Sequence, residues 1–93
     1  FIDAEKGDID SQYELGIIYA KGDGVEQDDT LSFSWFEKAA KQGYSEAQYI
    51  LGLMYSNGKG VEQDNELALK WFEKSAKQGH TDALNIINSV YKL

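Results

Sequence analysis

Four acidic residues beside glycines are the first candidates for chemistry in this sequence: Asp23, Glu26, Asp28 and Asp29. Carboxylate oxygens are the ligands that calcium prefers, and paired carboxylates can act as general acid and general base. The spacing of these four residues is not that of an EF-hand loop. The alternative interpretation is a solvated turn that ends in a helix N-cap, and the pattern favours it.

A segment of the same kind recurs 36 residues later, beginning at Gly58-Lys59-Gly60. The backbone amides of such a glycine run can form a phosphate-binding nest. However, Lys59 stands where the first segment has Asp23, so neither the calcium nor the anion interpretation holds for both copies. The carboxylate pairs do recur, as Glu26 with Asp28 and Glu62 with Asp64. Their recurrence indicates a part of the fold rather than catalytic carboxylates.

Residues for nucleophilic, metal or redox chemistry are scarce. The chain has no cysteine and a single histidine, His80, which argues against a thiolate zinc site, a histidine metal site and a Ser-His-Asp triad. We expect His80 to be a surface residue in a turn. Trp35 and Trp71 could stack on a ligand, but they recur at the repeat spacing, which favours core positions. The sequence therefore predicts no catalytic residue, no metal and no cofactor.

Composition narrows the range of partners. Nine lysines and no arginine oppose 16 acidic residues, and the net charge of 9 − 16 = −7 argues against a nucleic-acid partner. No apolar run has the length needed to cross a bilayer, so membrane insertion is not expected. The 93 residues can form only one small domain. The chain begins at Phe1, without an initiating Met or a signal peptide, which indicates a piece of a longer chain or a processed product.

An internal repeat organises the sequence. Residues 12–47 and 48–83 share 21 identical residues in 36 aligned positions. All nine glycines fall at four positions of this repeat, so none remains for a separate hinge or phosphate loop. The period divides the chain into the end of a preceding second helix at 1–7, a first repeat at 8–43, a second repeat at 44–79, and a half repeat or C-terminal capping helix at 80–93.

Within one unit, the apolar residues predict two helices. They recur at steps of three and four in residues 45–57 and again in residues 65–78. Ser45 and Asp64 are the predicted N-caps, and a glycine follows each helix as its stop.

Gly52 interrupts the first of these helices at a cost of about 1 kcal/mol relative to Ala. The same glycine recurs as Gly16, so we expect it to make room for a bulky side chain of the second helix, either Trp71 or Phe72. One helix pair cannot bury its apolar stripe, whereas stacked pairs bury it for each other. The predicted fold is therefore all-α, a right-handed superhelix of antiparallel helix pairs with about 36 residues per repeat. The open ends of such a solenoid could stack on a second copy.

These residues resemble the Sel1-like repeats, which are relatives of the tetratricopeptide family. The resemblance covers nearly the whole chain and rests on Ala47, Leu51-Gly52, Tyr55, Gly58, Gly60-Val61, Asp64, Ala68, Trp71-Phe72, Ser75-Ala76 and Gly79. The first unit repeats this pattern, with Ser11 and Ser32 in place of small alanines. In the third unit Asn88 replaces the glycine of the first helix, which favours a terminal cap.

The resemblance implies a binding scaffold rather than an enzyme. Members hold protein complexes together in signalling, in endoplasmic-reticulum quality control and in bacterial infection. In related tetratricopeptide units the first helix of each pair lines a concave groove. Carried over by the Leu-Gly-x2-Tyr landmark, this implies a partner-binding face made of Asp10, Tyr13, Ile17, Lys21, Glu46, Tyr49, Leu53, Asn57, Asp82 and Asn85, with the small residues Ala20, Ser56 and Ser89 at the same helix phase.

The implied face is an apolar and aromatic strip with acidic residues at one end. Such a strip suits an extended peptide or a helix with apolar anchors and some basic residues. In the alternative interpretation these side chains only pack between neighbouring first helices.

The sequence thus predicts a non-enzymatic protein that binds a protein or peptide partner. In a second hypothesis the repeats are a non-catalytic appendage of a larger enzyme or kinase-type signalling protein. In a third, the repeats hydrolyse a small substrate, which the lack of an unrepeated Ser-His, Cys-His or metal constellation argues against.

Overall fold

A computed structural model describes residues 2–91, with side chains from residue 4 onward. Phe1 and residues 92–93, which belong to the predicted terminal parts, lie outside the described residues. The described chain folds into helices joined by short turns. They are α1 (Ile2–Glu5), α2 (Ile9–Lys21), α3 (Asp29–Lys41), α4 (Ser45–Asn57), α5 (Asn65–Lys77) and α6 (Thr81–Tyr91). None of these helices has the length and apolarity of a membrane span.

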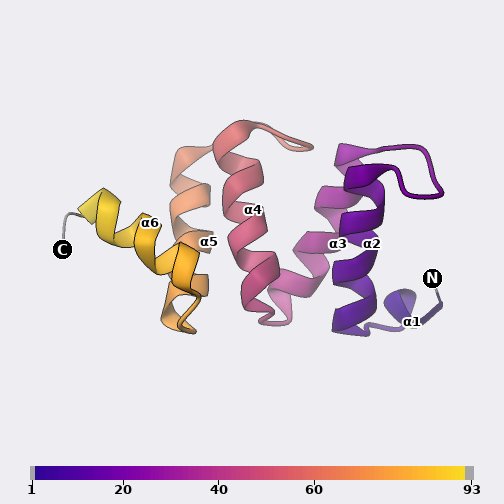
Figure 1. Cartoon of the computed structure of the whole chain (residues 1–93), viewed down its shortest axis with the longest axis horizontal. Coiled ribbons are helices and arrows are strands. Elements are labelled where there is room, and N and C mark those ends of the chain that lie inside the picture. Colours follow the sequence, from indigo (N-terminus) through magenta and orange to yellow (C-terminus); the bar gives the residue numbers. More distant parts are fainter. Residues whose placement is uncertain (1, 92–93) are drawn as a thin grey trace.

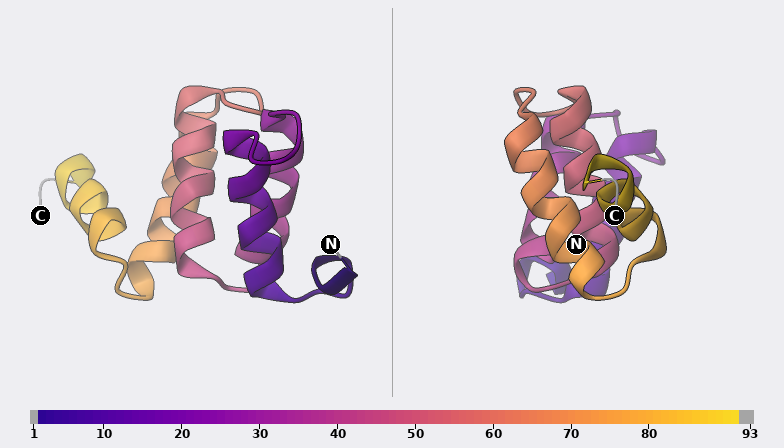
Figure 2. Two further views of the ribbon diagram at one scale, coloured as in Figure 1. Left: turned by 45° about the vertical axis from the view of Figure 1, so that its right-hand side comes forward. Right: turned by 90° about the vertical axis from the view of Figure 1, so that its left-hand side faces the viewer.

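The helices follow one another along the long axis of the molecule (Figure 1). The pairs α2–α3 and α4–α5 are antiparallel, and α3 packs against both α2 and α4. Two further views show α4 and α5 side by side, with α6 turned away at the C-terminal end (Figure 2). The molecule is elongated, with extents of 42 × 23 × 17 Å. This arrangement confirms the predicted solenoid of antiparallel helix pairs.

The helix ends follow the predicted local chemistry with one correction. Asp64 accepts a hydrogen bond from the Leu67 amide at 3.1 Å and so caps α5. Gly58 ends α4 in the left-handed conformation, with φ of 66°. Ser45 is not the N-cap of α4, because the carbonyl of Tyr44 already accepts the first helical bond, from the amide of Gln48 at 3.0 Å. Ser45 is therefore the first helical residue.

The repeated glycine of each first helix makes room for a phenylalanine. A Cβ placed on Gly52 would lie 2.5 Å from the ring of Phe72, and one on Gly16 would lie 2.6 Å from the ring of Phe36. Both rings are buried. Of the two expected partners of Gly52, the structure selects Phe72. The two helices of each pair therefore approach each other at the glycine more closely than a larger residue would allow.

The recurrence of the two tryptophans beside these phenylalanines favoured core positions, but both lie at the edge of the core. Trp35 and Trp71 are only half-buried. The ammonium groups of Lys38 and Lys74 lie 4.2 and 5.1 Å from the centres of these rings. Because the neighbouring phenylalanine fills the space at the glycine, the tryptophan covers the edge of the core and meets a cation on its outer side.

Glutamine side chains, of which Gln12 and Gln48 are buried, join one helix pair to the next. The side-chain amide of Gln48 donates to the carbonyl of Ala40 at 3.1 Å, and its oxygen accepts from Gln78 at 2.9 Å. Gln78 also donates to the carbonyl of Gly43 at 2.8 Å. The first unit repeats these bonds with Gln12 and Gln42. This glutamine set ties together the ends of three helices at each junction.

Candidate partner-binding surface

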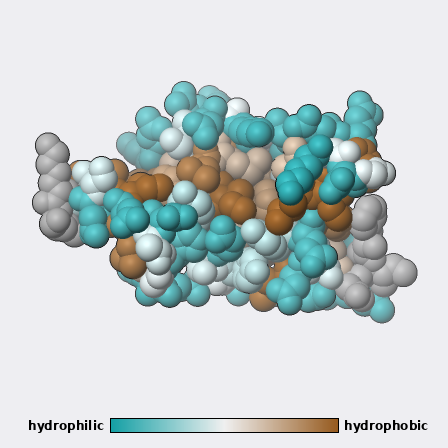
Figure 3. Space-filling model, in the orientation of Figure 1, coloured by the Kyte–Doolittle hydropathy of each residue, from teal (hydrophilic) through white to brown (hydrophobic). Residues whose placement is uncertain are grey.

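The ten residues of the predicted partner-binding face come from α2, α4 and α6. Figure 3 shows one side of the molecule, on which apolar side chains gather over α4 and toward α2 and α3. Five of the ten side chains are exposed: Asp10, Lys21, Asn57, Asp82 and Asn85. The other five, Tyr13, Ile17, Glu46, Tyr49 and Leu53, are partly buried.

The two tyrosines of the face also pack between helices. The ring of Tyr13 lies 5.6 Å from that of Phe36 and meets the ring of Tyr44 edge-on at 4.9 Å. The ring of Tyr49 lies 5.8 Å from Phe72 and stacks on His80 at 4.6 Å. Each tyrosine therefore joins its own helix pair to the residue that precedes the next first helix.

His80 is more constrained than the expected surface turn residue, because its side chain is only 12% exposed. Its Nε2 lies 2.7 Å from a carboxylate oxygen of Glu46. Its Nδ1 accepts a hydrogen bond from the amide of Ala83 at 3.2 Å, in the first turn of α6. A neutral ring that accepts at Nδ1 carries its proton on Nε2, which then donates to Glu46. His80 thus links α4 to the start of α6.

Negative charge gathers at one end of the face. Asp10, Glu46 and Asp82 stand in the first turns of α2, α4 and α6. Burial raises the pKa of Tyr49, and the charges of Asp82 and Glu46 raise it further. The pKa of Tyr13 is raised by burial and then by Glu46. The negative charges of these acidic residues therefore disfavour ionisation of the two tyrosines at the centre of the face.

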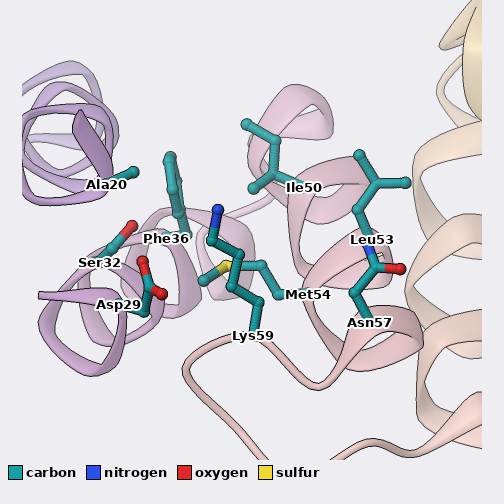
Figure 4. Close-up of a pocket in the computed structure, with 9 residues that line it drawn as sticks. All are labelled: Ala20, Asp29, Ser32, Phe36, Ile50, Leu53, Met54, Asn57 and Lys59. Carbon is teal, nitrogen blue, oxygen red and sulfur yellow. The ribbon is translucent and has the colours of Figure 1, made fainter.

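A pocket opens beside the other end of the face, between α2, α3 and α4 (Figure 4). Leu53 and Asn57 belong to the predicted face and reach this pocket. Ala20 also lies at the predicted groove phase of its helix. The other lining residues were not predicted from the sequence: Asp29, Ser32, Phe36, Ile50, Met54 and Lys59. The whole lining comes from three helices and a turn, so no spacing along the chain brings it together.

Asp28 and Asp29, two of the four acidic residues beside the first glycine turn, have separate roles. Asp28 caps α3 by accepting from the Leu31 amide at 3.0 Å, as the N-cap interpretation predicts. Asp29 lines the pocket, where its Oδ1 is buried without a hydrogen-bond partner. Within residues 2–91 no group of three or more His, Asp or Glu side chains gathers as a metal site.

Comparison with known proteins identifies the family. Residues 9–44 and 45–80 each match the model of the Sel1 repeat. The chain belongs to the Sel1 repeat family. Sel1 repeats are generally non-catalytic, tetratricopeptide-like scaffolds for protein interaction.

Solved Sel1 repeat structures share this fold. A Sel1 repeat protein from Oxalobacter formigenes is 48% identical with a TM-score of 0.90, over 92% of this chain and 65% of its own. The protein c5321, a protective antigen of uropathogenic Escherichia coli strains, is 39% identical with a TM-score of 0.90, over 95% and 19%. Cysteine rich protein B of Helicobacter pylori is 31% identical with a TM-score of 0.81, over 84% and 59%.

A curated relative is much longer than this Sel1 repeat chain. The exopolysaccharide production negative regulator of Rhizobium leguminosarum bv. viciae is 48% identical over 40 residues. The match spans 43% of this chain and 15% of the regulator.

Proposed function

We propose that this Sel1 repeat chain binds a peptide, or an exposed segment of a partner protein, on the face formed by α2, α4 and α6. The proposal rests on one observation. The face combines an apolar centre with an acidic residue in the first turn of each of the helices α2, α4 and α6. Partly buried apolar and aromatic side chains supply anchoring contacts, and an acidic rim favours partners that carry lysine or arginine. The proposed role is that of an adaptor without catalysis, cofactor or nucleic acid.

Charge reversal at the exposed acidic residues tests this function. A photocrosslinker at Leu53 captures the partner in its native source, and purified partner is then titrated against two double variants. Asp10→Lys with Asp82→Lys should weaken binding about tenfold or more, because two attractive contacts become repulsive. Glu26→Lys with Glu62→Lys changes the net charge equally at exposed turn positions and should have little effect. Equal loss in both variants would reject the proposed face.

A second candidate function is that of an appendage within a longer signalling or regulatory protein. The match to 15% of a regulator of exopolysaccharide production favours it. In this role the same face would bring a target to another domain of the same polypeptide. Deleting residues 8–79 from the full-length protein should then abolish regulation while the remaining domains stay folded. Retained regulation would contradict this role.

A further inference from the structure

The pocket between α2, α3 and α4 has the size and lining of a socket for one side chain. It encloses about 230 Å³, less than the roughly 300–1,000 Å³ of typical small-molecule sites. Phe36, Ile50, Leu53 and Met54 supply apolar walls. In Figure 4 the Lys59 side chain rises from the turn after α4 into the space between α3 and α4.

The repeat itself marks the pocket as a place of specialisation. The two units share 21 of 36 residues, yet seven of the nine lining residues differ from their counterparts 36 positions away. The exceptions are Phe36, which the fold requires at the glycine contact, and Ile50, which recurs as Ile86. Ala20 corresponds to Ser56, and Lys59 to Asp23. Because the same helix pair forms with either residue, the fold does not dictate these residue types, and they are free to determine binding.

We propose that this pocket receives one leucine- or phenylalanine-sized side chain of the partner, and that a lysine or arginine three or four residues away in the partner meets Glu46. This inference rests on the proposed function and names the partner segment that the face would accept. Glu46 is available for this contact, since its side chain is 42% exposed despite its bond to His80.

The spacing follows from the geometry of α4. Ile50 and Leu53 lie four and seven residues beyond Glu46, which corresponds to about 6–10 Å along the helix axis. An extended peptide covers this distance in about two or three residues, and a helical one presents side chains about 6 Å apart at positions i and i+4. A separation of three residues therefore suits an extended segment, and a separation of four residues suits a helical one.

Charge fixes which end of the segment is basic. Lys59 lies at the pocket, and its ammonium group forms no ion pair with a described residue. Asp29 lies at the same pocket, so its carboxylate and the Lys59 ammonium offset each other and the pocket does not select a cation. At the opposite end, Glu46 and the neighbouring Asp10 and Asp82 are acidic. The basic residue therefore lies toward the first turns of the helices, away from Lys59.

The probe for this inference is a synthetic glycine–serine peptide of about twelve residues with one leucine followed three and four residues later by lysines. Binding to ¹⁵N-labelled protein is measured by NMR chemical-shift titration. Ala20→Leu fills the pocket and should weaken binding about tenfold or more, since the peptide leucine loses its buried site. Ser56→Leu introduces the same leucine at the equivalent position of the second repeat and should change affinity less than about twofold.

The basic contact is tested by a double-mutant cycle. Glu46→Gln is combined with a peptide in which glutamines replace the lysines. Either change alone should weaken binding about threefold to tenfold, and both together should weaken it no more than one does. Glu66→Gln, an exposed change on α5, serves as the control and should show no coupling to the peptide lysines.

Four outcomes would overturn the inference: no binding of the peptide, equal effects of Ala20→Leu and Ser56→Leu, independent effects in the cycle, or shifts that map away from α2, α3 and α4. The proposed function fails separately. If the natural partner is lost from the Asp10→Lys and Asp82→Lys variant but not from Ala20→Leu, the face binds a partner and the pocket is not its anchor.

Discussion

At the scale of single residues, the contact between Gly52 and Phe72 explains a glycine that helix propensity alone would disfavour. We expect Gly52→Ala to destabilise the protein by about 1–3 kcal/mol, although alanine is the better helix former. The reason is the Cβ, which would lie 2.5 Å from the Phe72 ring. Urea unfolding followed by circular dichroism measures the change.

The control for this prediction is Phe72→Leu, which removes the ring that the new methyl group would meet. In that background Gly52→Ala should cost much less, so the two changes should be clearly non-additive. Additive effects would mean that the glycine is required for another reason, such as backbone flexibility.

The raised pKa values of the tyrosines predict a loss of stability in alkali. Tyr49 ionises near its usual value of 10.0 only in the unfolded chain, because burial and the charges of Asp82 and Glu46 raise its pKa in the fold. Above that pH the unfolded state loses its proton first. The free energy of unfolding should therefore hold below about pH 10 and fall as the pH rises through the folded pKa.

Urea titrations between about pH 8 and about pH 11 measure this dependence, and absorbance at the phenolate band reports the ionisation itself. The Tyr49→Phe variant should show a shallower fall in stability than the wild type. An identical fall in the two proteins would assign the alkaline transition to other groups.

Residue roles were predictable where the repeat supplies a second copy. The glycine contact and the caps at Asp28 and Asp64 follow from recurrence and local chemistry. The tryptophans were misplaced because recurrence shows that a residue supports the fold, but not whether it is buried. The role of His80 could not be predicted, because Glu46 is 34 residues away in sequence.

At the scale of elements, the glutamine set predicts that neighbouring helix pairs are joined by polar as well as apolar contacts. Gln48→Leu should destabilise the protein by about 1–3 kcal/mol, since the Ala40 carbonyl and the Gln78 amide each lose a buried partner. Chemical denaturation measures the loss. Gln63→Leu removes an exposed bond to the Ser56 carbonyl and is the matched control. Equal losses would show that burial does not govern these bonds.

Periodicity was sufficient to predict the helices themselves, and it fixed most of their ends. The N-cap of α4 was assigned one residue too late because serine is the commoner cap residue, whereas the Tyr44 carbonyl accepts the first helical bond. Contacts between units were not predictable, since they depend on how far each pair rotates against the next. The pocket belongs to this class, because its lining comes from α2, α3, α4 and a turn.

At the scale of the whole molecule, stability should be graded along the solenoid. Each helix packs chiefly on its neighbours in the chain, so α3 and α4 lie at the centre of the solenoid, while α6 is the last described helix and packs chiefly on α5. Exposed Leu84, Val90 and Tyr91 mark this unsupported end. Hydrogen exchange should show the strongest protection for amides of α3 and α4 and the weakest for α6.

Destabilising one unit tests whether this gradient reflects local coupling. In a chain of nearest-neighbour contacts, Gly52→Ala should reduce amide protection most in α4 and α5, less in α3 and least in α2. A molecule that unfolds only as a whole would instead lose protection equally in its best-protected amides. Hydrogen exchange of the variant and the wild type under the same conditions separates the two. A graded loss would also mean that the pocket, built across the α3–α4 junction, can open without unfolding the first repeat.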